Sequence, residues 1–214
     1  MRQIIKGREP RSLTEHRAAA YADYENYAEK DGLRAALVQE QGGLCCYCMG
    51  RIDPDPERMK IEHWAAQDTH PERQLDYRNL LGACLGAQGQ PLALQHCDTH
   101  KGSQAIRVHP ADPQRSCERS IVYRADGTID SEQPDVRRDL QEVLNLNVRR
   151  LRENRKATAD AVVEGMRRKY PDGWSRALLE QELQRWRERD VSGAYRPYCQ
   201  AAVFWLEKRL AREA

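Results

Sequence analysis

The sequence predicts an α+β fold in which a small irregular module lies between two helical segments. Apolar residues recur at helical spacing over residues 12–41 and again from residue 135 onward. Residues 44–102 are instead rich in Cys, His, Gly and Pro, with only short apolar pieces. Residues 120–129 contain Asp126-Gly127 between two short apolar runs, which predicts a small hairpin with a type I′ turn. We therefore expect a helical arm over residues 1–43, a central module over 44–134 and a helical region over 135–214.

The N-terminal arm is predicted to be helical because Leu13, Ala20 and Tyr24 share one helical face. A second run begins at Leu33 and stops at the glycine pair 42–43, since glycine favours the end of a helix.

The C-terminal region has a longer apolar stripe. Its members step mostly at intervals of three, four or seven residues, as in a helix that faces a core: Val136, Leu140, Val143, Leu144 and Leu151. Residues 174–189 and 197–212 predict two further helices.

The composition excludes several classes of protein. Hydrophobic residues make up 40% of the 214 positions and charged residues 32%, and there is a single Phe. The longest apolar stretch, residues 199–206, is far shorter than the ~20 residues of a membrane-spanning helix. The first ten residues lack the apolar segment of a signal peptide. We expect a cytoplasmic protein without a membrane partner, and a formal charge of +2 does not by itself indicate a polyanionic partner.

The seven cysteines favour a metal site over a disulfide framework, because the sequence shows no secretion signal. Cys45 and Cys48 form a Cys-x2-Cys pair, whose tight turn can direct two sulfurs at one tetrahedral Zn²⁺ ion. Cys84 and Cys97 supply a second pair, although His96 or His100 could replace Cys97 as the fourth ligand. The alternative is that these are simply buried thiols. The three cysteines outside the pairs are predicted to be structural: Cys46, Cys117 and Cys199.

Three further motifs are interleaved with the cysteines. They are Ile61-Glu62-His63 at the end of a short strand, the segment 76–84 that contains Asn79-Leu80 before Cys84, and the segment 96–102 that ends in Lys101-Gly102. Their order over residues 45–102 resembles an HNH endonuclease with the ββα-metal fold.

The resemblance implies a set of catalytic roles. Glu62 and Asp98 match the ligands of a catalytic Mg²⁺ or Mn²⁺ ion, with His100 as a possible replacement for Asp98. His63 matches the general base, and Asn79 matches the residue that orients it. Taken singly, each of these residues also has a structural interpretation, as a surface charge, a core histidine, a turn former or a helix cap.

The sequence departs from the commonest HNH pattern at three places. The second cysteine pair is Cys-x12-Cys, the acid before the base is Glu62, and Asp98 stands where His or Asn is usual. The first departure leaves the fourth zinc ligand open, and the other two leave the geometry of the catalytic metal open.

A narrower resemblance extends over roughly residues 40–160. It is carried by the segments 76–81 and 96–102, the hairpin around residue 126, and the run 144–155 with its Leu-Asn-Leu-Asn start. Together they resemble the HNH subunit of Septu-type anti-phage systems, including versions attached to retrons. The resemblance implies DNA as the substrate and an ABC-type ATPase as a partner, with the C-terminal helices as a possible docking element. For the substrate, the alternative is RNA or tRNA. For the activity, the alternative is a zinc-stapled module that binds nucleic acid or acts as an adaptor without catalysis. For the C-terminal helices, the alternative is that they only cover the module.

A basic cluster precedes the end of this region. The cluster consists of Arg149, Arg150, Arg152, Arg155 and Lys156. On a helix, the spacing of three between Arg149, Arg152 and Arg155 would gather their charges on one arc. Such an arc suits phosphate or, equally, a solvated helix face.

Overall fold

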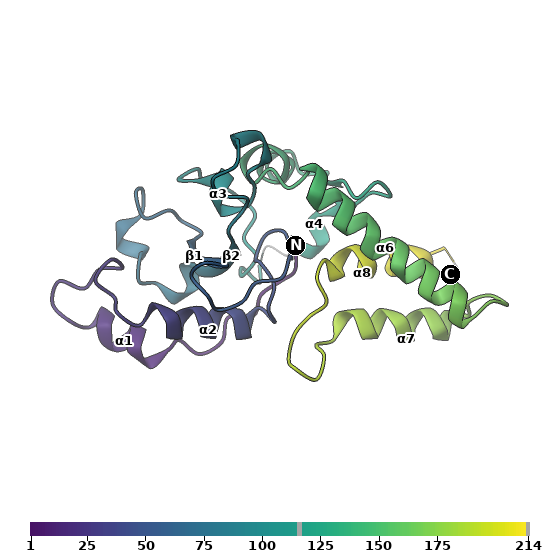
Figure 1. Cartoon of the computed structure of the whole chain (residues 1–214), viewed down its shortest axis with the longest axis horizontal. Helices are drawn as coiled ribbons and strands as arrows, with labels where there is room; N and C mark the ends of the chain where they lie inside the picture. The colour runs from purple at the N-terminus through teal and green to yellow at the C-terminus, as the bar shows by residue number, and fades with distance from the viewer. Residues whose placement is uncertain (115–116, 213–214) are drawn as a thin grey trace.

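The computed structural model describes residues 1–114 and 117–212. The helices are α1 (Arg11–Arg17), α2 (Lys30–Glu40), α3 (Asp98–Lys101), α4 (Cys117–Ser120), α5 (Pro134–Arg138), α6 (Arg149–Lys169), α7 (Arg176–Arg187) and α8 (Cys199–Leu210). The strands are β1 (Met59–His63), β2 (Leu80–Cys84), β3 (Val122–Tyr123) and β4 (Ile129–Asp130). The strands form two small antiparallel sheets, β1–β2 and β3–β4. Figure 1 shows the β1–β2 pair on one side of the molecule and helices α6, α7 and α8 on the other. The expected mixture of helices and short strands is confirmed.

The N-terminal arm differs from its prediction, because residues 18–29 form turns between α1 and α2 instead of continuing a helix. The side chain of Asn26 accepts a hydrogen bond from the Asp23 amide at 3.1 Å, and Asp23 accepts one from the Asn26 amide at 2.8 Å. Such side-chain bonds to nearby amides compete with helical hydrogen bonds. Tyr24 therefore does not share a helical face with Leu13. The predicted end of α2 before the two glycines is confirmed.

The β1–β2 pair carries most of the motif residues. His63 at the end of β1 pairs with Leu80, and Met59 at its start pairs with Cys84. Helix α2 packs beneath this pair in Figure 1. Gln41, just after α2, fixes the contact, because its side chain accepts a bond from the Gly82 amide at 2.6 Å and donates one to the Gly82 carbonyl at 2.8 Å. The short helix α3 lies above the pair in the same view, on the opposite side from α2.

The predicted hairpin is confirmed as β3–β4, but its turn is of another type. A type I′ turn needs positive φ at two central residues, and here Gly127 has a φ of 81° while Asp126 is not in the left-handed region. The Gly127 amide donates to the Arg124 carbonyl at 3.0 Å, and the Arg124 amide donates to Thr128 at 2.8 Å. These bonds describe a type I turn followed by a left-handed glycine.

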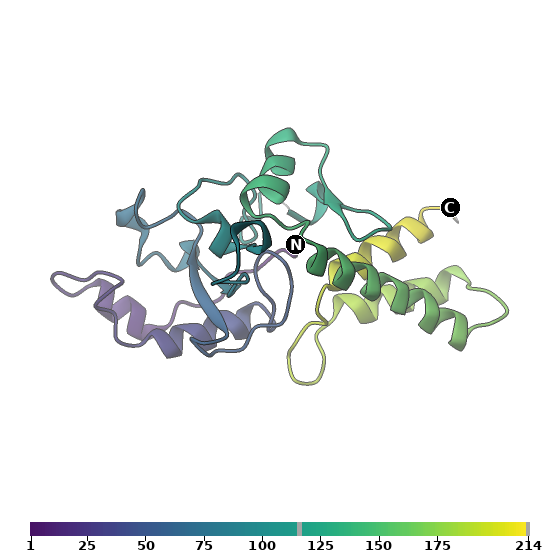
Figure 2. The ribbon, with the colours of Figure 1, turned by 45° about the horizontal axis from the view of Figure 1, so that its top comes forward.

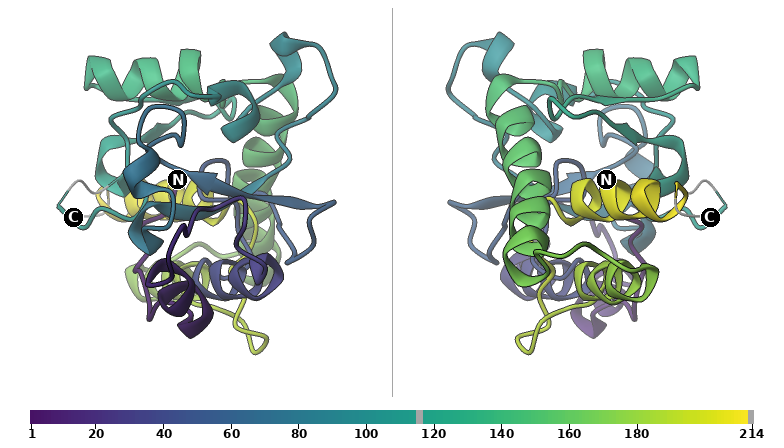
Figure 3. Two further views of the ribbon diagram at one scale, coloured as in Figure 1. Left: turned by 90° about the vertical axis from the view of Figure 1, so that its left-hand side faces the viewer. Right: turned by 90° about the vertical axis from the view of Figure 1, so that its right-hand side faces the viewer.

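The C-terminal helices form as predicted, with their ends shifted by about two residues. The members of the expected stripe from Val136 to Leu151 are all buried, but they do not lie on one helix. A π-helical turn over Asp139–Val143 follows α5, and the non-helical residues 144–148 precede α6. Helices α6, α7 and α8 pack together around a second apolar cluster that includes Val162, Leu179 and Leu206. Figure 3 shows α6 crossing beside α7 and α8.

The main apolar core gathers residues from Met1 to Leu151, and the N-terminus lies between the β1–β2 part and the three long helices (Figure 2). The domain boundaries at residues 43 and 134 stay predictions. Within the described ranges, no helix is both long enough and apolar enough to cross a membrane.

Candidate metal and catalytic site

Four cysteine side chains meet at one point. The Sγ atoms of Cys45, Cys48, Cys84 and Cys97 all lie within 4.8 Å of one another. Cys45 and Cys97 are 3.9 Å apart, and Cys48 and Cys84 are 3.8 Å apart. Tetrahedral Zn²⁺ with Zn–S bonds of about 2.3 Å separates its sulfurs by about 3.8 Å. The cluster could therefore hold a structural metal such as zinc. It joins the turn after α2 to the end of β2 and the start of α3, so a bound ion would connect these segments.

The structure brings Cys97 into this cluster, and neither His96 nor His100 is part of it. His96 Nε2 lies 3.1 Å from the Arg150 guanidinium, and its Nδ1 lies 3.2 Å from the Cys97 sulfur. Because a guanidinium can only donate, Nε2 accepts and the proton sits on Nδ1, which donates to the sulfur. His96 thus supports the Cys97 sulfur from outside the cluster. His100 Nδ1 lies 2.9 Å from the Val143 carbonyl.

The other three cysteines are not members of the cluster of four and are buried, as expected of structural residues, although the Cys46 thiol is hydrogen-bonded to that of Cys45. Cys46, Cys117 and Cys199 are each at most 3% exposed. The backbone amide of Cys46 donates to the Gly82 carbonyl at 3.0 Å.

Two carboxyl groups meet beside the cysteine cluster, on β1 and at the start of α3. Glu62 is 2% exposed, and its Oε1 lies 2.7 Å from the Tyr47 hydroxyl and 2.9 Å from the Lys101 ammonium. The Glu62 carboxyl is also hydrogen-bonded to Asp98. Lys60 Nζ lies 3.5 Å from Asp98 Oδ2. Burial, together with the neighbouring Asp98 carboxyl, raises the pKa of Glu62 well above its usual range.

His63 follows Glu62 on β1 and is held in one tautomer. Its Nε2 lies 3.0 Å from the backbone carbonyl of Gln74. Because a carbonyl can only accept, Nε2 carries the proton and Nδ1 keeps its lone pair. The His63 side chain is only 7% exposed, and this burial lowers the pKa of its imidazole. His63 therefore has the features of a base: it is neutral near pH 7, fixed in orientation and provided with one available lone pair.

Asn79 acts on His63 indirectly. Its fully buried side chain accepts a bond from the Ala65 amide at 2.8 Å and donates to the Ala65 and Arg73 carbonyls at 3.0 and 3.1 Å. These bonds close the loop between β1 and β2, and this loop presents the Gln74 carbonyl to His63. Asn79 thus holds the group that orients His63.

Several residues around this site carry no signal in the sequence. The Tyr24 ring meets the His63 ring edge-on at 4.5 Å, and the Tyr24 amide donates to the Gln74 side chain at 3.0 Å. Burial raises the pKa of Tyr24 to about 12. Contacts between loops so far apart in the chain cannot be inferred from periodicity. Lys101 lies within a recognised motif, so its place in the sequence could have marked it as a partner of Glu62.

The basic cluster of the sequence does not form one surface. Arg149 is exposed and pairs with Glu153 at 2.6 Å, while Arg150 reaches His96. Arg155 is 2% exposed and donates to the Gly127 carbonyl at 2.6 Å and the Leu146 carbonyl at 2.8 Å. A helical arc that binds phosphate through Arg149, Arg152 and Arg155 is therefore not supported.

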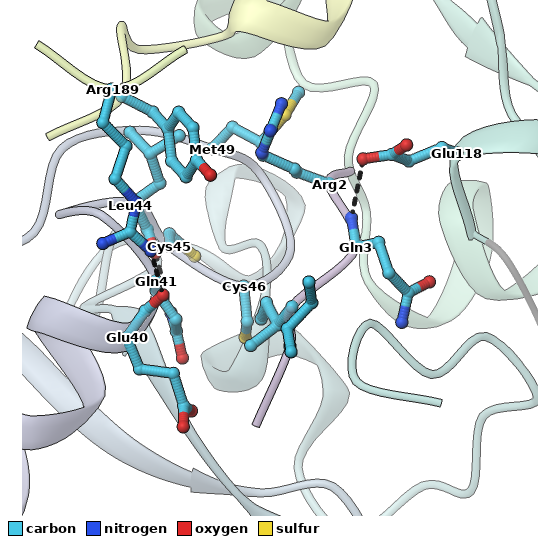
Figure 4. Close-up of a pocket in the computed structure, with 13 residues that line it drawn as sticks. Arg2, Gln3, Glu40, Gln41, Leu44, Cys45, Cys46, Met49, Glu118 and Arg189 are labelled. Atoms are coloured by element: carbon cyan, nitrogen blue, oxygen red, sulfur yellow. Dashed lines mark hydrogen bonds between the residues drawn. The ribbon is translucent and has the colours of Figure 1, made fainter. Parts of the chain in front are cut away.

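A cavity of about 270 Å³ lies on another side of the cysteine cluster (Figure 4). Its lining includes Cys45, Cys46 and Arg189, and Arg189 donates to the Glu40 carbonyl at 2.7 Å. Neither Glu62 nor His63 lines this cavity, so it is separate from the carboxylate pair.

The fold and these side chains define a mixed α/β protein with a candidate metal-binding cysteine cluster. No family model matches the chain. Over 61 residues the chain is 33% identical to the Septu protein PtuB of Bacillus thuringiensis. The match covers 28% of this chain and 24% of the length of that relative. The similarity agrees in part with the resemblance seen in the sequence motifs.

Proposed function

We propose that the chain is a metal-dependent HNH endonuclease that hydrolyses phosphodiester bonds of DNA in a Septu-type anti-phage system. The observation that carries this proposal is the position of His63 beside two carboxyl groups. Glu62 and Asp98 contact each other, and the neighbouring His63 keeps its Nδ1 lone pair. The partial similarity to a Septu protein supports the setting.

The carboxylate pair suits a divalent cation. Both Tyr47 and Lys101 bond Oε1 of Glu62, so neither occupies Oε2. The hydrogen bond between the two carboxyl groups requires a proton on one of them, and a cation that replaces this proton would hold both groups ionised without repulsion between them. Mg²⁺ and Mn²⁺ prefer such oxygen ligands and retain several waters. A bound ion would supply charge neutralisation at the phosphate and at the leaving oxygen. His100 could contribute only through Nε2, because its Nδ1 contacts a carbonyl.

The side chains of this chain supply the remaining functions. In the proposed reaction, His63 Nδ1 accepts a proton from the attacking water. The Gln74 carbonyl holds the ring in place and stabilises the imidazolium that forms, because Nε2 already donates to it. Asn79 keeps the Gln74 loop closed, and Lys101 offsets part of the negative charge of Glu62.

The substrate and partner belong to the same proposal. DNA is the proposed substrate, and RNA or tRNA is the alternative, since a site that grips a backbone phosphate does not itself select the sugar. An ABC-type ATPase is the proposed partner. Helices α6 to α8 are the proposed docking element, because the carboxylate pair and the cysteine cluster involve none of their residues.

The test is a cleavage assay with the full chain, purified with its zinc. Plasmid DNA and total tRNA are incubated with the chain and Mg²⁺ or Mn²⁺, with and without the ABC-type ATPase proposed as its partner. His63→Ala is compared with His70→Ala, which removes an exposed histidine that pairs with Glu72. Zinc content and thermal unfolding are measured for each variant.

We expect metal-dependent cutting that His63→Ala abolishes and His70→Ala preserves, with the zinc content unchanged in both. Cutting of tRNA alone would replace the proposed substrate with RNA. Cutting that survives His63→Ala would remove the base from the mechanism. The absence of any cutting, even with the ATPase, would favour a non-catalytic binding or adaptor module.

A further inference from the structure

A second cavity, of about 270 Å³, lies between the β3–β4 hairpin and helices α6 and α8. Its lining includes Tyr123 and Gly127 from the hairpin, Ala159 from α6, and Phe204 and Trp205 from α8. Figure 2 shows the hairpin beside α8, away from β1. None of the lining residues belongs to the cysteine cluster or the carboxylate pair.

The charge of this cavity has one sign. Five of its lining residues are basic and none is acidic: Arg124, Arg155, Lys208, Arg209 and Arg212. The charge of Arg124 is offset by Asp130, which lies 2.5 Å from its guanidinium. Arg155 lies in the buried part, and its guanidinium donates to the Gly127 and Leu146 carbonyls and to the Asn147 amide oxygen. Within the described residues, no carboxylate forms an ion pair with Arg155, Lys208 or Arg212. Because the buried Arg155 already donates to three protein oxygens, the charges available to an anionic ligand are those of the exposed Lys208 and Arg212 at the mouth.

The wall of the cavity is aromatic. The Tyr123 and Phe204 rings lie 5.6 Å apart at 48°, and Trp205 lines the same space. Phe204 and Trp205 are only half-buried, although both line the cavity. Aromatic faces next to Arg and Lys are the combination on which nucleobases stack while their phosphates are neutralised.

We propose that this cavity binds one nucleotide unit, with the base against Phe204 and Trp205 and the phosphate at Lys208 and Arg212. Its volume of about 270 Å³ is just below the range of ligand pockets, which starts at about 300 Å³, so it suits a single base and its phosphate and no larger ligand. The unit comes either from a free nucleoside phosphate or from a single strand of nucleic acid, since both present the same chemistry. The binding does not depend on the proposed cleavage reaction.

Equilibrium binding to the full chain tests this proposal. Fluorescent AMP and dAMP are titrated into the protein, and the matching nucleosides and inorganic phosphate serve as competitors. Arg212→Glu and Lys208→Glu reverse charges at the mouth. Ala159→Leu fills the cavity from α6, where Ala159 is half-buried. Arg167→Glu is the matched control, because Arg167 is exposed on α6 and does not line the cavity.

We expect saturable binding of a nucleotide, which a nucleoside or phosphate alone competes for poorly. Each of the three cavity variants should raise Kd about tenfold, while Arg167→Glu leaves it unchanged. A short single-stranded oligonucleotide, tested in the His63→Ala background, distinguishes the two sources. Tighter binding of the oligonucleotide than of the mononucleotide identifies a strand, and the reverse order identifies a free nucleotide.

Two results would overturn the proposal. One is the absence of saturable binding for both the mononucleotides and the oligonucleotide at millimolar concentration. The other is a Kd that Arg212→Glu, Lys208→Glu and Ala159→Leu change no more than the Arg167→Glu control does.

Discussion

Replacing Asn79 by alanine should destabilise the protein strongly, because one side chain closes the loop that positions His63. The change removes three hydrogen bonds from a fully buried position, one from the Ala65 amide and two to the Ala65 and Arg73 carbonyls. A typical protein hydrogen bond contributes about 1 kcal/mol, so the loss should be about 3 kcal/mol. In a chain of this size each kcal/mol lowers Tm by roughly 2–4 °C, which gives a decrease of roughly 6–12 °C.

Urea and thermal unfolding of the zinc-loaded protein measure this effect, and Asn26→Ala is the matched control. Asn26 also uses both side-chain atoms, accepting from the Asp23 amide and donating to the Tyr21 carbonyl, but at an exposed position. Its loss should therefore cost about 1 kcal/mol or less. An Asn79→Ala variant no less stable than Asn26→Ala would refute the reasoning that the loop is held by Asn79.

Three further changes have expected outcomes of their own. Gly127→Ala should lower the free energy of unfolding in urea more than Gly89→Ala does. Both glycines have a φ of 81°, but of the two only Gly127 would place an added Cβ 2.0 Å from a backbone carbonyl oxygen. Equal losses of stability would contradict this. At a saturating metal concentration, which keeps Glu62 ionised, cleavage should stay at its maximum down to below pH 6.5, because burial lowers the pKa of His63. The contribution of the neutral ring to stability should be lost as the pH falls below this value, and a rate that already falls above pH 6.5 would count against the base. Cys84→Ser should lose bound zinc while Cys117→Ser keeps it, measured by metal analysis, and equal zinc contents would remove Cys84 from the ligand set.

The local features of the sequence predicted much of this structure. The Cys-x2-Cys pair fixes two sulfurs within one turn, and the two further cysteines, Cys84 and Cys97, join it in space. The residues of the apolar stripe from Val136 to Leu151 are buried as predicted, although non-helical residues 145–148 separate Leu151 on α6 from the other members. These predictions succeeded because they depend on residues close together in the chain or on the narrow choice of ligands that a structural zinc site accepts.

The failures have the opposite origin. Residues 18–29 have helical periodicity, but the reciprocal bonds of Asp23 and Asn26 to backbone amides stabilise turns instead. The spacing of Arg149 and Arg155 indicates a shared face, yet Arg155 is drawn inward by the Gly127 carbonyl, 28 positions away in the chain. Tyr24 meets His63 through a loop packing that no periodicity encodes. Long-range contacts of this kind are the part of the site that the sequence alone does not reveal.

The central claim is that Glu62 and Asp98 hold the catalytic metal, and the binding of Mn²⁺ to the zinc-loaded chain tests it most directly. Binding is measured by calorimetry and by the electron paramagnetic resonance signal of the free ion. Glu62 and Asp98 are the proposed ligands, and Glu72, an exposed carboxylate beside His70, provides the control. We predict one Mn²⁺ site that Glu62→Gln or Asp98→Asn weakens at least tenfold and that Glu72→Gln leaves intact. Binding that is absent, or that persists unchanged in both site variants, would contradict the claim that this carboxylate pair holds the catalytic metal.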